Sequence, residues 1–263
     1  EYKHDGWKVR GRIADEEVVM QFVSGAREHD HCLGGKKLWH MYRKHFEGNR
    51  PVGRDRFEYI LDKYNLKVRK KKRKPRTTDS RHGLPTYPNQ AKSYIPTQAN
   101  RLWVSDITYI PIHVNESKHI FCYLSLILDA YSKEIVGWAV GGTLETGHCI
   151  HALRMALKRV DDTSGKELIH HSDRGCQYAS KEYTSLLREY GITISMTEDG
   201  NPKDNAQAER INNTMKNELL KGKSFCDIKE VTEAVEKAVL FYNTERPHMS
   251  INMMTPQEAA THT

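Results

Sequence analysis

Residues 102–111 read LWVSDITYIP, and residues 120–129 read IFCYLSLILD. The first stretch predicts a strand that ends before Pro111, and the second, a continuous apolar run, predicts a strand buried on both faces. A third strand is expected where residues 135–140 read IVGWAV. Three strands this close together in the chain predict a meander.

Helices and strands alternate after this meander. Residues 145–160 carry apolar side chains at helical spacing, a strand is expected at 167–172, a helix near 180–190 and a fifth strand at 193–196. This order predicts an α/β fold with a mixed five-stranded sheet flanked by helices. A later amphipathic stretch, from Val231 to Phe241, predicts a C-terminal helix.

The chain before this sheet is expected to contain a small all-α domain and a linker. Apolar stripes within residues 15–64 predict three short helices, which fits a helix-turn-helix arrangement, with a generic helical bundle as the alternative. We therefore expect a helix-turn-helix-like DNA-binding domain over 1–66. A basic and Pro/polar linker is expected over 67–100, and a catalytic core with its C-terminal helix over 101–263.

Positive charge is concentrated in the predicted linker. The net charge is +7, and residues 67–76, KVRKKKRKPR, carry eight Lys or Arg and no acid. The rest of the chain is then close to neutral, so this run is a discrete polycation suited to a phosphate backbone. The alternative is a solvated charge block with no partner.

Composition excludes several protein classes. The five cysteines are odd in number and contain no Cys-x-x-Cys pair, which argues against a disulfide framework or a zinc ribbon. The longest apolar stretch, residues 120–128, is shorter than the roughly 20 residues that a membrane span needs. We expect a cytoplasmic protein, associated with the nucleoid when bound to DNA, and no membrane partner.

Three acidic residues occupy positions that suggest a specific role for their carboxylates. Asp106 lies in the middle of an apolar strand, where burial is costly without a cation or hydrogen bonds. Asp173 follows the fourth strand, and Gly175 is expected to allow a sharp exit there. The ends of strands in α/β sheets are where ligand sites collect.

The third acid, Glu209, is expected on a helix. Asn201 is a candidate N-cap, Pro202 the first helical residue and Asp204 the capping acid. Glu209 falls at the edge of an apolar stripe, so it can lean towards the two aspartates at one lip of the sheet. Three converging carboxylates repel each other unless hard divalent cations lie among them, and two Mg²⁺ ions fit this donor set.

Five segments of the chain together resemble the DDE transposases of bacterial insertion sequences, of the type whose catalytic part resembles a retroviral integrase. The spacing adds to the resemblance, because 35 residues separate Asp173 from Glu209. The matching segments are Trp103–Tyr109, Asp129–Trp138, His171–Tyr178, Gly200–Glu209 and Tyr242–His248. The segment after the glutamate departs from the family, which usually has Phe-Phe where this chain has Arg210-Ile211-Asn212.

The resemblance implies an RNase H-like fold in which Asp106, Asp173 and Glu209 form the catalytic, metal-binding triad. Two Mg²⁺ ions are implied as cofactors, with Mn²⁺ able to substitute, and Asp106 would bridge them. Transposon terminal inverted repeats and target DNA are the implied partners, bound by a homo-oligomer. The expected DNA contacts are Lys216, Gln177, Tyr178, Arg54, Arg56, Arg69, Lys70, Lys71, Lys72, Arg73 and Lys74.

These expectations define one function and two alternatives. The expected reaction is metal-dependent cleavage of transposon ends followed by transesterification, in which a 3′-OH attacks a target phosphate. A hydrolytic RNase H-like nuclease would use only water as nucleophile and would give no joined product. A transposase-derived DNA-binding protein would bind without cutting.

Overall fold

The computed structural model describes residues 6–46, 52–68, 83–115, 118–160, 167–198 and 205–262. These residues fall into two compact units, one with residues 6–68 and 247–253 and the other with residues 83–246 and 254–262.

The smaller unit contains three helices, α1 (Gly6–His29), α2 (Gly35–His45) and α3 (Arg54–Lys63), and the short 3-10 helix η4 (Met249–Ile251). The three-helix expectation is confirmed, although α1 begins earlier than its apolar stripe indicated. The helices enclose a shared apolar core whose fully buried members include Val19, Leu38, Tyr42, Phe57 and Ile60. A helix-turn-helix role for these helices stays a prediction.

A buried acid ties α1 to α3. Glu16 is 6% exposed and accepts hydrogen bonds from Lys63 Nζ at 2.7 Å and Tyr64 OH at 2.6 Å. Arg56, one of the expected DNA contacts, pairs with the same carboxylate. The bonds from Lys63 and Tyr64 lower the pKa of Glu16 from 4.5 to about 2. The positive charges of Arg56 and Lys63 in α3 are therefore paired with an acid inside the unit.

We expect Glu16→Gln to destabilise the helical unit in a pH-dependent way. Because the folded pKa lies below the unfolded value, the charge stabilises the fold fully above about pH 4.5 and loses its effect as pH falls towards 2. The urea midpoint of α1 to α3, followed by pulsed hydrogen exchange and mass spectrometry, should differ from wild type at pH 7. That difference should shrink below pH 4.5, whereas Glu17→Gln, an exposed neighbour, should match wild type throughout.

The larger unit is built on one mixed sheet of five strands. The strands are β1 (Leu102–Asn115), β2 (Lys118–Asp129), β3 (Ile135–Gly141), β4 (Ile169–Ser172) and β5 (Thr193–Met196). Their order is β3-β2-β1-β4-β5, with β1, β2 and β3 antiparallel and β4 and β5 parallel to β1. The predicted meander and the mixed five-stranded sheet are confirmed.

β1 does not end before Pro111, as the sequence suggested, but continues to Asn115. Only Leu102–Ser105 of β1 pair with β4, so the rest of the strand has β2 on one side alone. The N–H of His113 points away from β2 and donates to Phe225 O at 2.8 Å. Pro111, two residues earlier, directs its nitrogen to the same side, so its missing N–H costs no bond to β2.

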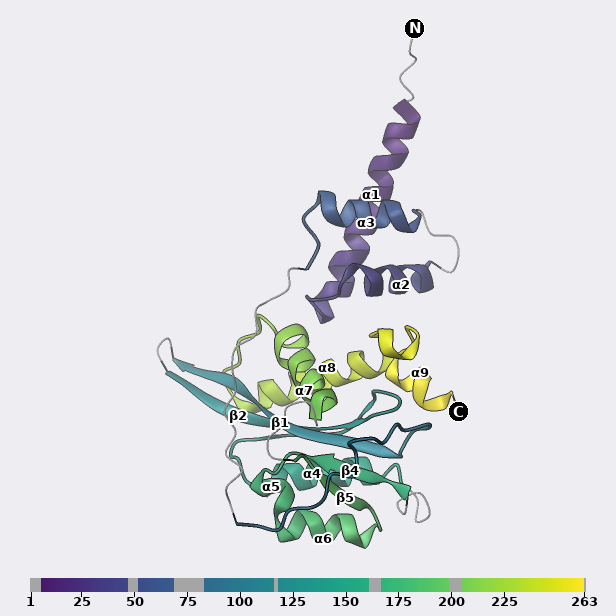
Figure 1. The fold of residues 1–263 in the computed structure, drawn as a ribbon. Coiled ribbons are helices and arrows are strands. Elements are labelled where there is room, and N and C mark those ends of the chain that lie inside the picture. The colour runs from purple at the N-terminus through teal and green to yellow at the C-terminus, as the bar shows by residue number, and fades with distance from the viewer. Residues whose placement is uncertain are drawn as a thin grey trace. The chain divides into compact units, whose positions relative to one another are not determined.

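Helices cover both faces of this sheet (Figure 1). One layer consists of α4 (Thr146–Leu157), α5 (Cys176–Ala179) and α6 (Lys181–Glu189). The other consists of α7 (Ala206–Thr214), the π-helical segment η3 (Met215–Leu219), α8 (Ile228–Thr244) and α9 (Pro256–Thr261). Trp103, Leu153 and Tyr183 are fully buried between the sheet and the first layer.

The described part of the predicted linker packs on the sheet unit. The backbone N–H of Gln90 donates to Ser195 Oγ at 2.8 Å, and Arg188 donates to Tyr87 OH at 2.6 Å. Polar composition predicted a linker here, and it does not reveal the specific contacts that tyrosine and backbone groups provide. None of the five cysteines, which all lie in the described residues, forms a disulfide. Among the described helices, none is long and apolar enough to cross a membrane.

Candidate active site

The sheet places two of the predicted catalytic acids on neighbouring strands. Ser105 of β1 pairs with Ser172, the last residue of β4, in the parallel ladder; Asp106 is the next residue of β1, and Asp173 comes directly after β4. Side chains at matching positions of paired strands project to the same face. The two carboxylates therefore start from adjacent positions where β4 ends.

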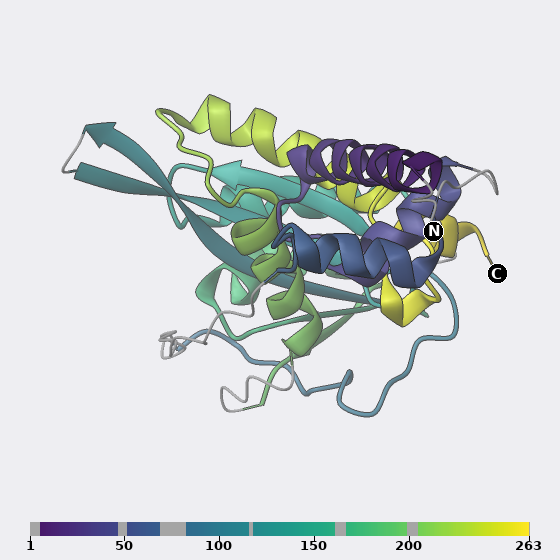
Figure 2. The ribbon, with the colours of Figure 1, turned by 90° about the horizontal axis from the view of Figure 1, so that it is seen from above.

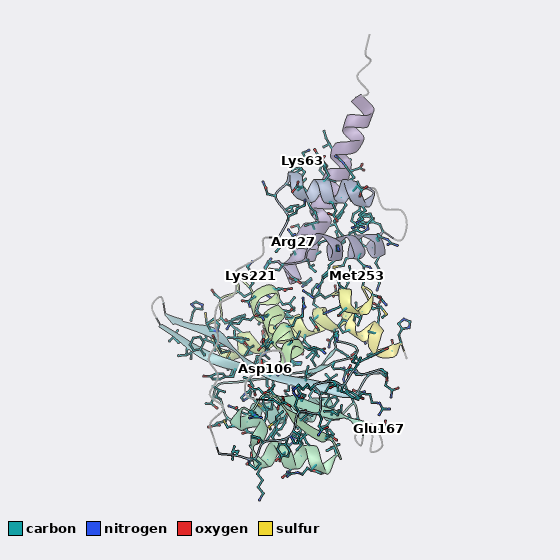
Figure 3. The ribbon with its side chains drawn as sticks, in the orientation of Figure 1. Arg27, Lys63, Asp106, Glu167, Lys221 and Met253 are labelled. Atoms are coloured by element: carbon teal, nitrogen blue, oxygen red, sulfur yellow. The ribbon has the colours of Figure 1, made fainter. Side chains whose placement is uncertain are left out.

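Asp106 is held by hydrogen bonds from its own strand and from α7. It is 4% exposed, and its Oδ1 accepts from Ile107 N at 2.9 Å while its Oδ2 accepts from Asn212 Nδ2 at 2.9 Å. Figure 3 labels Asp106 in the sheet layer. Asn205, just before α7, donates to Ser105 O at 2.9 Å. The two amides tie the start and the middle of α7 to the strand carrying Asp106.

Gly175 leaves space beside Asp173, which differs from the sharp exit that the sequence led us to expect of it. Its φ of −63° and ψ of 142° are open to any residue, so no special backbone turn depends on it. A Cβ at this position would lie 3.0 Å from Asp173 Oδ1 and 3.1 Å from Gln177 Oε1. The Gly175 N–H also donates to Asp173 Oδ1 at 3.0 Å. Glycine thus leaves room for the carboxylate and orients it.

Glu209 lies in the first turn of α7 and is half-buried. It precedes Asn212 by three residues, so the two share one side of the helix, and Asn212 contacts Asp106. The predicted apolar stripe is confirmed, since every member is buried: Ala208, Ile211, Met215 and Leu219.

The start of α7 differs from the expectation. The helix begins at Ala206, with Asn205 at the N-cap position. The expected cap, Asn201, and the expected helical residues Pro202 and Asp204 lie outside the described residues.

The structure sets the two aspartates side by side and places Glu209 one helical turn from the Asp106 contact. Within the described ranges, no three His, Cys, Asp or Glu side chains gather closely enough to hold a metal ion. The oxygen donors nevertheless suit a hard cation, and Mg²⁺ is usually bound by one or two carboxylates plus waters and substrate phosphate. Asn212 Oδ1 adds a buried oxygen that has no hydrogen-bond partner among these residues.

Two titratable groups, Tyr178 and Cys149, are buried in the core beneath the aspartates. Burial raises the pKa of the Tyr178 phenol well above its ordinary value, and the nearby charges of Asp106 and Asp173 act in the same direction. Burial likewise raises the pKa of the Cys149 thiol to about 12, with a smaller contribution from Asp173. Both groups stay neutral at physiological pH and belong to the buried core on one side of the carboxylates.

The expected DNA contacts have different surroundings. Tyr178 is 1% exposed, with its hydroxyl 3.1 Å from Ser105 Oγ, and Gln177 is 7% exposed and donates to Leu144 O at 2.7 Å. Their surfaces are almost wholly covered, which fits packing beneath the site. Lys216 is half-buried in η3, and exposed Arg54 lies 3.8 Å from Glu58. The basic residues from Arg69 to Lys74 lie outside the described part of the chain.

Sequence reasoning missed the contacts that anchor η3 and α8. Arg246, 4% exposed, pairs with Glu218 of η3, and burial strongly raises the pKa of Tyr242 beside it. Asn243 bonds both the N–H and the carbonyl of Ile135 at 3.0 Å. The motif of Tyr242, Asn243 and Arg246 is thus explained by packing, and only its resemblance to the family marked it in the sequence.

We expect Asn212→Leu to lower catalytic turnover by roughly 10- to 100-fold, the usual effect of removing a group that orients a metal ligand. Leucine keeps the volume but leaves the Asp106 carboxylate without its amide donor. Single-turnover strand-transfer assays, with DNA affinity measured in parallel, would show this as a rate effect. Asn213→Leu, at the exposed next position, should be neutral, and equal losses in both variants would contradict the assignment.

Comparison with known proteins agrees with the architecture. The family described as "Integrase core domain" matches residues 96–202, which contain both aspartates, and a second family of the same description matches residues 190–256, which contain Glu209. A protein of insertion element IS600 from Shigella sonnei is 35% identical over 78% of this chain and 74% of its own length. The chain belongs to the integrase-core proteins of bacterial insertion sequences.

Other relatives extend the match over nearly the whole chain. The transposase for insertion sequence element IS629 from Shigella sonnei is 32% identical over 98% of this chain and 83% of its own length. A putative transposase for IS986/IS6110 from Mycobacterium tuberculosis (strain CDC 1551 / Oshkosh) is 33% identical over 86% of this chain and 80% of its own length. The chain is thus a transposase of the DDE polynucleotidyl transferase class, which acts in transposition by DNA strand transfer.

A solved structure shares the fold. The simian T-cell lymphotropic virus intasome, solved with PP2A regulatory subunit B56 gamma, aligns with a TM-score of 0.52 and 16% identity over 88% of this chain and 72% of the other. The predicted RNase H-like, integrase-type core of the transposase is confirmed.

Proposed function

We propose that this transposase cleaves the ends of its insertion sequence and joins the freed 3′-OH groups to target DNA at Asp106, Asp173 and Glu209. The observation that carries this proposal is the register of β1 and β4, which brings two aspartates to adjacent positions. The bond from Asn212 then links the Asp106 carboxylate to the helix that carries Glu209. The same three positions carry the resemblance to the DDE family.

Asp106, Asp173 and Glu209 would hold divalent cations, with two Mg²⁺ ions as our specific proposal. When bound, such a pair lowers the pKa of an attacking water or hydroxyl and stabilises the charge on the leaving oxygen. The chain's own part is positional. Asn212 and the Ile107 N–H orient Asp106, the Gly175 N–H orients Asp173, and the buried Tyr178 limits solvent on one side.

We further propose that double-stranded DNA, as terminal inverted repeats and target, is bound by several copies of the chain. The relatives named as transposases and the intasome fold support DNA binding and assembly. The basic run at residues 67–76 supplies charge for the phosphate backbone, so affinity should fall steeply with salt.

A strand-transfer assay tests the proposal. The full chain is incubated with a labelled duplex of its own element's end and a supercoiled target plasmid, in Mg²⁺, in Mn²⁺ or in EDTA. We expect nicked ends and covalently joined products in either metal, and neither in EDTA. Hydrolysis without joining would favour a nuclease, and binding without cutting would favour a non-catalytic DNA-binding protein.

A further inference from the structure

The far half of the β1–β2 hairpin carries an aromatic face that is largely exposed in the larger unit. Tyr109 is 54% exposed and Phe121 is 48% exposed, and their rings meet edge to face at 5.3 Å. Tyr109 pairs across the strands with Tyr123, and Pro111 pairs with Phe121, so all four side chains share one face. Figure 2 shows this end of the hairpin extending beyond the helices of the larger unit.

This face is on the opposite side of β1 from Asp106. Asp106 and Tyr109 are three residues apart in one strand, about 10 Å along it, and therefore project to opposite faces. The helix formed by α7 and η3 contacts both, through Asn212 on Asp106 and through Lys216 on Tyr109. Lys216 therefore reaches from this helix past the edge of β1 that is open where β4 ends.

Lys216 lies at the edge of β1, between the face that carries Asp106 and the face that carries Tyr109. Its Nζ lies 3.5 Å from the centre of the Tyr109 ring, a cation–π contact, and Tyr109 is still 54% exposed. Lys221 and Lys223 follow on exposed backbone, and Figure 3 labels Lys221 just after η3. Phe225, two residues further, accepts the His113 N–H of the hairpin. A basic segment thus borders the aromatic face.

Aromatic faces beside lysines suit one kind of ligand. Bases stack on aromatic rings with little regard to sequence, while the neighbouring cations follow the phosphates. Bases inside a duplex present only their edges in the grooves, so stacking requires unpaired nucleotides. A second protein copy would also cover apolar rings, but it gains nothing from the adjoining positive charge.

We propose that Tyr109, Phe121 and Lys216 form a binding surface for unpaired nucleotides next to the DNA end held at the carboxylates. This inference rests on the proposed function, because the surface would bind the DNA strand that leaves the carboxylates and passes around the open edge of β1. Tyr109 supplies the nearest stacking face, Phe121 the next one along the hairpin, and Lys216 a phosphate contact between the site and the rings.

The test compares blunt and tailed DNA by fluorescence anisotropy in EDTA, so that binding is measured apart from catalysis. The probe is a labelled duplex of about 30 base pairs, blunt or with a 3′ tail of about five thymidines. Wild type should bind the tailed probe about ten-fold more tightly. Tyr109→Leu and Phe121→Leu keep apolar bulk without a stacking face, and each should lose most of that preference while binding the blunt probe as wild type does.

Two controls make the outcome decisive. Tyr109→Phe should keep the tail preference, and Tyr190→Leu, which removes an exposed tyrosine at the end of α6, should behave as wild type. Light scattering records the oligomeric state of every variant. The inference is overturned if wild type shows no tail preference. It is also overturned if the leucine variants keep the tail preference, whether or not light scattering shows that copies of the chain have dissociated.

Failure of this inference can be told apart from failure of the proposed function. Strand transfer by wild type is assayed in parallel with its metal. If wild type joins strands but shows no tail preference, the surface is wrong and the catalytic assignment stands. If wild type neither nicks nor joins, the catalytic assignment fails whatever the anisotropy shows.

Discussion

Strand transfer should fall by about a thousand-fold or more in Asp106→Asn, in Asp173→Asn and in Glu209→Gln, because several kcal/mol of metal-dependent stabilisation would be lost. Each change keeps the shape of the side chain and removes its charge. An amide has one weak oxygen donor where the carboxylate has two charged ones, so a divalent cation loses a ligand. Single-turnover assays of both nicking and joining would measure the loss.

DNA affinity should stay close to wild type in all three variants, because the acids do not contact phosphate without a metal. Asp227→Asn is a matched control: it removes an exposed acid at the N-cap of α8, where asparagine caps equally well, and should leave strand transfer unchanged. Measurable strand transfer by a triad variant would remove that residue from the mechanism. A general loss that also affects Asp227→Asn would point to an effect of charge alone.

Of the three predicted catalytic acids, Glu209 is the one for which sequence and structure give the most different information. Spacing and motif place it in the triad, whereas the structure leaves it half-buried, one turn from Asn212, outside any three-residue metal group among the described residues. A helix side chain has more rotamer freedom than a strand carboxylate held by backbone N–H groups. We therefore expect the Glu209 side chain, more than that of either aspartate, to move when a metal ion binds.

The sheet could be predicted from sequence because its signals are local. The continuous apolar run at Ile120–Asp129 and the short strand at Thr193–Met196 carry their own pattern, and both are strands in the structure. Pro111 misled the prediction, because its cost depends on which edge its nitrogen faces. The nitrogen faces away from β2, and that edge has no partner strand because β4, which lies far away in the chain, ends early.

The site could be predicted only as far as the acids themselves. Asp106 stood out as a charge in an apolar strand, but its donor, Asn212, is 106 residues away, and nothing in the local pattern marks it as a hydrogen-bond partner. The same holds for the pair of Arg246 with Glu218. Tyr178 was expected to contact DNA from its motif, but it is 1% exposed and packs in the core beneath the acids.

The second large effect is expected at Gly137 of β3, within the motif that the sequence shares with the family. A Cβ at Gly137 would lie 2.2 Å from the carbonyl oxygen of Ala152 and 3.1 Å from Ala156 Cβ, both in α4. The nearest clash is with backbone, which has no rotamer to relieve it, so α4 must move off the sheet. We expect Gly137→Ala to cost about 3 kcal/mol, which corresponds to a fall in Tm of roughly 6–12 °C.

Gly147→Ala in the first turn of α4 makes the matched comparison, because nothing lies within 4 Å of a Cβ built there. Alanine favours the helix over glycine by about 0.5–1 kcal/mol, so this variant should melt at or slightly above the wild-type temperature. Differential scanning calorimetry of the full chain measures both. Opposite signs for the same chemical change would show that close approach of α4 to β3 requires glycine at 137. A Gly137→Ala protein as stable as wild type would contradict that packing, and with it the layer that supports β2 and, through β2, the strand of Asp106.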